Sequence, residues 1–131
     1  MTNSEKSTSH WIGSTSDDPD MFLRFTGLEA EVLTYVAAPH RTAIIAIKGL
    51  SPGGDMFAVL HGCRMFMMPV SWTVGCLSVR REDPDTIVLS DSECNVDVYF
   101  YAGRLCSRND AIAYFGESIF LRQLISEFHS S

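Results

Sequence analysis

The fold class is decided by residues 29–48, which read EAEVLTYVAAPHRTAIIAIK. β-Branched and other apolar residues dominate 30–37 and 42–48, and Pro39-His40 between them is typical of a turn. Alternate residues of a strand face opposite sides of a sheet, and both sides of the first run carry apolar side chains. The stretch therefore predicts two antiparallel strands, the first of them inside a sheet.

The same pattern continues toward the C-terminus, where Gly, Pro and Asp interrupt apolar runs at regular intervals. Residues 50–55 form the clearest loop, and Gly62 ends the strand that follows it. Pro69 has no backbone N–H, so it either divides a long apolar segment or forces a bulge in it. Further strands are expected at 56–61, 64–68, 71–80, 86–89, 96–101 and 104–106.

The last residues change period, because four apolar side chains recur at helical spacing and predict a helix with one apolar face. These four are Leu121, Leu124, Ile125 and Phe128. Asn109 or Asp110 is a candidate cap for an earlier helical turn over 111–115. Strands in one run with helices at the ends predict an α+β fold, with an antiparallel β-sheet of about six to seven strands and a C-terminal helix packed on one face.

The N-terminal residues 1–16 are rich in Ser, Thr and Asn, and this composition buries too little apolar surface to offset the entropy of ordering. A flexible N-terminal arm is therefore expected at 1–16, with Trp11-Ile12-Gly13 as an apolar anchor that docks onto the body. The chain has 131 residues, of which 46% are hydrophobic, and this is the size and composition of one domain. Residues 17–131 are expected to form a single α+β domain.

The net charge restricts the partners. Ten Lys and Arg against sixteen Asp and Glu give a formal charge of −6, and a nucleic-acid binder needs a basic surface instead. No apolar run approaches the roughly 20 residues that span a bilayer, and the polar N-terminus lacks the pattern of a secretory signal. We expect a soluble cytoplasmic protein that binds neither nucleic acid nor membrane.

The cysteines and histidines do not form a recognisable reactive or metal-binding motif. No two of the four cysteines make the close pair of a zinc or redox site, so we expect reduced thiols, no metal and no cofactor. His61-Gly62-Cys63 suggests a nucleophile beside its base, but it lacks an orienting third group. A strand end followed by a glycine kink is the preferred interpretation, and no enzymatic activity is predicted.

Charge placement is the most distinctive feature of the middle of the chain. Between positions 82 and 97 there are six acids and no Lys or Arg, which predicts an acidic surface that attracts a basic protein. The acids are Glu82, Asp83, Asp85, Asp91, Glu93 and Asp97. They fall on two loops at opposite ends of the strand 86–89, about 13 Å apart by strand rise. The alternative interpretation is a solvated rim that keeps the protein soluble.

One part of the chain, about residues 25–106, resembles a known family. The segments LEAEVL at 28–33 and FAVLHGC at 57–63, followed by a Trp-containing stretch, resemble small bacterial immunity proteins of polymorphic toxin systems. The resemblance implies a protein without catalysis that binds a cognate toxin in the cytoplasm and neutralises it. An acidic inhibitor suits a toxin with a basic substrate cleft.

Two other functions compete with this one. The aromatic and methionine content of 56–72 is consistent with a small-ligand-binding or enzymatic β-rich domain that has an apolar pocket. Trp11 and the methionines of 65–68 are also candidates for a homodimer interface. For these methionines, filling of the core is the favoured role.

Overall fold

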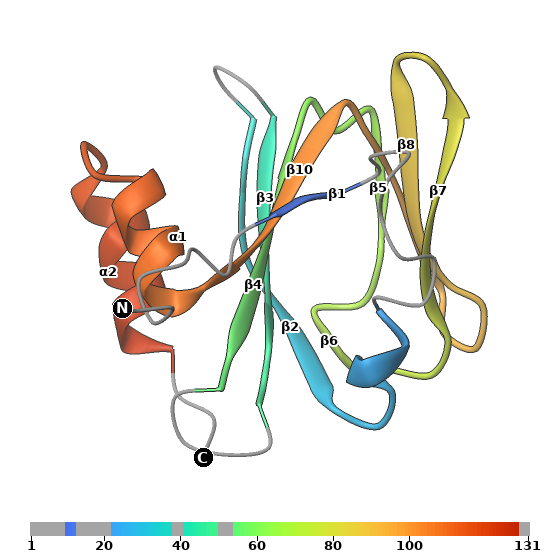
Figure 1. Cartoon of the computed structure of the whole chain (residues 1–131), viewed down its shortest axis with the longest axis horizontal. Coiled ribbons are helices and arrows are strands. Elements are labelled where there is room, and N and C mark those ends of the chain that lie inside the picture. The colour runs from blue at the N-terminus through green and yellow to red at the C-terminus, as the bar shows by residue number, and fades with distance from the viewer. Residues whose placement is uncertain (1–9, 13–21, 38–40, 50–53, 129–131) are drawn as a thin grey trace, which may run out of the picture.

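The computed structural model describes residues 10–12, 22–37, 41–49 and 54–128. Within these ranges the chain forms three layers, with two helices on one side, a six-stranded sheet in the middle and a four-stranded sheet on the other side (Figure 1). All strand pairs are antiparallel. The predicted α+β class with antiparallel strands and a C-terminal helix on one face is confirmed, and the structure adds the division of the strands into two sheets.

The six-stranded sheet has the order β1-β10-β4-β3-β2-β6. Its strands are β1 (His10–Ile12), β2 (Glu29–Val36), β3 (Thr42–Ile47), β4 (Met56–His61), β6 (Ser71–Thr73) and β10 (Ala102–Ser107). All six residues of β3 are buried, because this strand lies in the middle of a sheet with both faces covered. The run TAIIAI meets that demand, since it offers apolar side chains to both faces.

The four-stranded sheet has the order β5-β9-β8-β7. Its strands are β5 (Met65–Met67), β7 (Leu77–Asp83), β8 (Thr86–Asp91) and β9 (Val96–Phe100), and a short 3₁₀ helix, η2 (Leu23–Phe25), precedes β2. β9 shows the predicted alternation, with Val96, Val98 and Phe100 buried between the sheets. The segment 71–80, expected as strand, instead divides into β6 and β7, which belong to different sheets.

The two faces of the six-stranded sheet support separate cores. The larger core lies between the sheets and contains, among others, Ile45, Leu60 and Phe100. The smaller core lies under the helices, where Ile44 and Phe57 meet helix residues. Successive residues of β3 thus belong to different cores, as the two-residue period of a strand requires.

Two helices cover the outer face of the six-stranded sheet, α1 (Arg108–Tyr114) and α2 (Ile119–Glu127). The Ser107 hydroxyl caps α1 by accepting from the Asp110 N–H, and the Ser118 hydroxyl caps α2 in the same way. The prediction of Asn109 or Asp110 as the cap of the first helix was therefore wrong. The cap lies at Ser107, where the last strand ends and the helix begins.

Part of the expected N-terminal arm is strand, because His10–Ile12 pairs with β10 and Ile12 is buried between the sheets. The other residues of 1–16, and the predicted Pro39-His40 turn, lie outside the described residues. β9 and β10 are separated only by Tyr101, so the chain passes from one sheet to the other within a single residue. At that point the Tyr101 N–H donates to the His61 carbonyl.

Candidate functional site

The acids predicted from the sequence fall into two groups at the two ends of β8. Glu82, Asp83 and Asp85 lie exposed at the β7–β8 hairpin. Glu93 is exposed in the turn after β8, and Asp97 is half-buried on β9. The two-ended arrangement agrees with the expectation from strand length, so these five acids do not make one focused pocket.

Arginines interrupt the acidic surface at the β7–β8 hairpin. Arg80 forms an ion pair of 3.4 Å with Glu82, and Arg81 donates to the Pro84 carbonyl. Arg64, which precedes β5 in the chain, donates to the Thr86 hydroxyl on this end of β8. Three cations therefore accompany the three acids of the hairpin, and its attraction for a basic partner is weaker than the sequence run indicates.

Local hydrogen bonds also hold one hairpin acid in its ionised form. The backbone N–H of Asp85 donates to the Asp83 carboxylate at 2.9 Å, and this is the main reason why the pKa of Asp83 is lowered. The Thr86 hydroxyl and the charge of Arg64 lower it further. These contacts shape a tight hairpin turn.

Asp91 does not belong to the predicted acidic surface, because its side chain is only 1% exposed. One carboxylate oxygen accepts from the Trp72 indole N–H at 3.2 Å and from the Gly75 N–H at 2.8 Å. The other accepts from the N–H groups of Cys76 and Glu93, at 2.8 and 3.1 Å. The assignment of Asp91 to a partner-binding surface was wrong, because this carboxylate joins β6 of one sheet to the end of β8 in the other.

The environment of Asp91 has two opposed effects on its ionisation. Burial raises the pKa of the carboxyl, and the hydrogen bonds from backbone N–H groups and the Trp72 indole lower it. The hydrogen bonds prevail, so the pKa of Asp91 lies below its ordinary value. This carboxylate is a structural anion that holds the β6–β7 and β8–β9 connections together.

On the outer face of the four-stranded sheet, β5 carries two exposed methionines beside half-buried side chains of β9. Met65 lies opposite Tyr99, and Met67 lies opposite Asp97, on the pair β5–β9. Tyr101 follows two residues after Tyr99 and is 62% exposed. The helices lie on the other sheet (Figure 1). We define the Met–Tyr face as Met65, Met67, Asp97, Tyr99 and Tyr101.

The exposure of two methionines contradicts the expectation that the methionines fill the core. Met65 and Met67 are 43% and 51% exposed, whereas Met68 and Phe66 pack against the core between the sheets. The alternation of β5 explains the difference, because it turns Phe66 inward, where its ring stacks on Tyr35 at 5.4 Å. Met65 and Met67 therefore cannot line an interior pocket of the kind proposed for a ligand-binding domain.

His61 and Cys63 do not form a catalytic pair. Gly62 has a φ of +69°, and this kink places Cys63 in the core between the sheets, where burial raises the pKa of its thiol to about 11. The His61 ring lies within hydrogen-bond distance of the Thr42 hydroxyl, at 3.0 Å, and of the Tyr114 hydroxyl on α1, at 2.7 Å. The predicted strand end with a glycine kink is confirmed.

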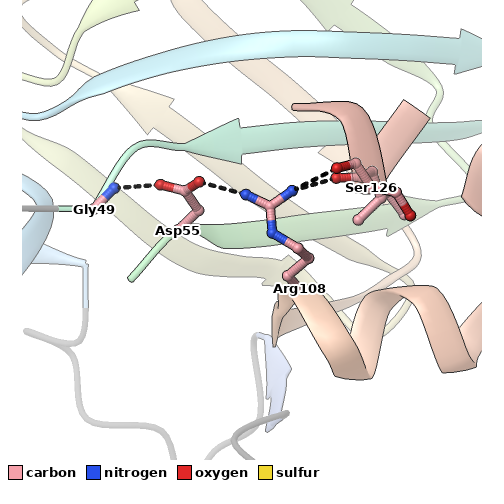
Figure 2. A network of polar contacts seen from close by, with 5 residues as sticks. Gly49, Asp55, Arg108 and Ser126 are labelled. Atoms are coloured by element: carbon pink, nitrogen blue, oxygen red, sulfur yellow. Dashed lines mark hydrogen bonds and ion pairs between the residues drawn. The ribbon is translucent and has the colours of Figure 1, made fainter. Parts of the chain in front are cut away.

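A partly buried ion pair that the sequence analysis did not find fastens the helices to the sheet (Figure 2). Arg108, the first residue of α1, donates to the Asp55 carboxylate at 2.7 Å, and Asp55 also accepts from the Gly49 N–H at 2.8 Å. The second arm of the guanidinium donates to the carbonyls of Ile125 and Ser126 at the end of α2. One side chain thus joins the start of α1, the end of α2 and the entrance to β4.

No protein-family model, no curated protein and no solved structure matches this chain. Among the described residues, no three His, Cys, Asp or Glu side chains gather in a way that could hold a metal ion. None of the four cysteines is in a disulfide. Within the described ranges, no helix has the length and apolar character needed to cross a membrane.

Proposed function

We propose that this protein is a non-enzymatic protein-binding domain that contacts its partner through the Met–Tyr face. The observation that carries this proposal is the exposure of Met65 and Met67 on β5, with the exposed Tyr101 directly after the neighbouring β9, on the sheet that lies away from α1 and α2. Met and Tyr are enriched at protein interfaces, and Tyr is among the residue types that most often contribute a large share of the binding free energy. Exposed apolar side chains that are grouped, rather than scattered, mark a binding surface.

The partner that we propose is a cognate bacterial toxin, which makes the protein an immunity protein. Two features support this class, namely the resemblance of residues 25–106 to immunity proteins and the formal charge of −6. Asp97 lies within the Met–Tyr face, and Glu93 is exposed in the turn just before β9. A partner with an apolar contact bordered by Lys or Arg would complement this surface.

The decisive experiment combines genetics and binding. If the gene upstream encodes a secreted protein with a C-terminal toxin domain, that domain is expressed in a host with and without this protein. We expect growth only when both are present, and tight binding of the two purified proteins by calorimetry. Failure of the protein to restore growth would eliminate the immunity function.

Variants then locate the interface. Met67→Ala and Tyr101→Ala should each weaken toxin binding by about tenfold or more, because buried aromatic and methionine anchors often contribute more than 1 kcal/mol. Both side chains are exposed in the free protein, so folding should not change. Ile119→Ala is the matched control, since Ile119 is 77% exposed on the opposite layer. If all three variants bound the toxin with the affinity of the parent protein, the interface would lie away from the Met–Tyr face.

A further inference from the structure

The two helices form a contiguous segment that follows β10. α1 begins directly after β10, and within the described residues no strand follows α2. The segment 108–128 can therefore leave the sheet without breaking any strand pairing. We propose that α1 and α2 form a lid that opens as one unit from the six-stranded sheet while the two sheets stay folded, and that the Arg108–Asp55 ion pair is the latch that keeps the lid closed. This inference is independent of the proposed function.

The apolar attachment of the lid is small compared with the core between the sheets. The buried side chains that the lid supplies are Ala111, Ile125 and Phe128, and they meet Ile44, Phe57 and their neighbours on the sheet. Helices of seven and nine residues are too short to be stable in water alone, so their stability depends on this contact. A layer with few buried side chains opens at a lower free energy than the core does.

Polar contacts add to this attachment, and they lie at both ends of α1. At its first residue, Arg108 bridges Asp55 of the sheet and the last carbonyls of α2 (Figure 2). At its last residue, the Tyr114 hydroxyl meets the His61 ring at 2.7 Å. Because the same guanidinium holds both helices, loss of the ion pair releases them together.

The chain contains two thiols that report separately on the two cores. Cys106 lies under the lid with Phe57 and Ile125, and it is fully buried. Cys63 lies between the sheets and is 3% exposed. Opening of the lid exposes Cys106 alone, whereas exposure of Cys63 requires separation of the sheets.

Thiol alkylation in native buffer tests the proposal. In the full chain carrying Cys76→Ser and Cys94→Ser, iodoacetamide labelling is followed by peptide mass spectrometry. We expect Cys106 to react at least about tenfold faster than Cys63, with a weaker dependence on urea, because partial opening exposes less surface than global unfolding. Equal rates with equal urea dependence would overturn the proposal, since both thiols would then react only through global unfolding.

Substitution of Arg108 provides a second test in the same alkylation experiment. Arg108→Met should raise the Cys106 rate by about tenfold or more and leave the Cys63 rate within about threefold, because a buried carboxylate then loses its partner. Arg80→Met is the matched control, since it removes an exposed ion pair on β7 and should change neither rate. A parallel rise of both rates in Arg108→Met would show that the ion pair stabilises the whole fold, and would refute the latch. If this variant does not fold, the comparison of the two thiols in the parent chain still decides between lid opening and global unfolding.

Discussion

Replacement of Asp91 by Asn tests whether one buried carboxylate joins the two sheets. The carboxylate accepts four hydrogen bonds, two on each oxygen. An amide keeps a single oxygen, so two N–H donors lose their acceptor whichever way the amide is turned. A buried donor without an acceptor costs about 1–3 kcal/mol, and three of these four donors are only partly buried, so the free energy of unfolding should fall by about 2–3 kcal/mol. That is a large part of the 5–15 kcal/mol typical of a domain.

The assay is urea unfolding at pH 7, followed by tryptophan fluorescence. The matched control is Asp97→Asn, which makes the same chemical change at a half-buried side chain on the neighbouring β9 and should alter stability by less than about 0.5 kcal/mol. A loss below about 1 kcal/mol in Asp91→Asn would refute the structural role that we assign to the carboxylate.

The pH dependence of stability in the parent protein and in Asp91→Asn provides a second check. The pKa of Asp91 is lower in the folded protein than the value of about 3.9 in an unfolded chain. Its contribution to stability is therefore fully present above that unfolded value, and it is lost as the pH falls through the folded pKa. The difference in stability between the parent and Asp91→Asn should be constant from pH 7 to about pH 5 and should narrow toward pH 2. A constant difference down to pH 2 would contradict the lowered pKa.

Three further changes follow from the contacts described above. Asp55→Ala should lower the free energy of unfolding by about 2–4 kcal/mol in urea titrations, because Arg108 is left partly buried without its anion; a loss under about 1 kcal/mol would contradict this. Gly62→Ala should lower the Tm by about 5 °C or more, since the glycine has a φ of +69° and a Cβ there would lie 2.8 Å from that of Tyr101; an unchanged melting curve would show that the kink relaxes without cost. Tyr114→Phe should lower the free energy of unfolding by about 1 kcal/mol, because it removes only the Tyr114 hydroxyl that meets the half-buried His61 ring. A stability equal to that of the parent would show that this hydrogen bond contributes nothing.

Local patterns in the sequence were sufficient to predict the elements that bury one face against a single core. The alternation in 96–101 predicted β9, and the helical spacing of Leu121 and Ile125 predicted α2, because each element buries one face against a continuous core. The break within 71–80 could not be found in this way. Its cause is Asp91, which lies fifteen residues beyond Cys76 in the chain and organises the Gly75-Cys76 turn through the fold.

The candidate site was harder to predict, because charge along the chain is not charge in space. The sequence between Glu82 and Asp97 contains no cation, but Arg64 and Arg80 are brought beside its first acids by β5 and by the hairpin itself. Asp91 differs from the exposed acids only in the strand register that turns it inward. The Met–Tyr face depends likewise on which side of β5 each methionine occupies, and a three-residue strand is too short to reveal its period.

The order of the strands along the chain makes the folding of the two sheets interdependent. The chain enters the four-stranded sheet at β5, returns with β6, enters again at β7 and returns with β10, so neither sheet is a continuous stretch of sequence. The six-stranded sheet is completed only after every described strand of the four-stranded sheet, because β10, which pairs with β4, follows β9 in the chain. Many of the stabilising contacts therefore close long loops, which slows folding and makes it cooperative. A fragment that carries the strands of only one sheet is consequently expected to stay unfolded.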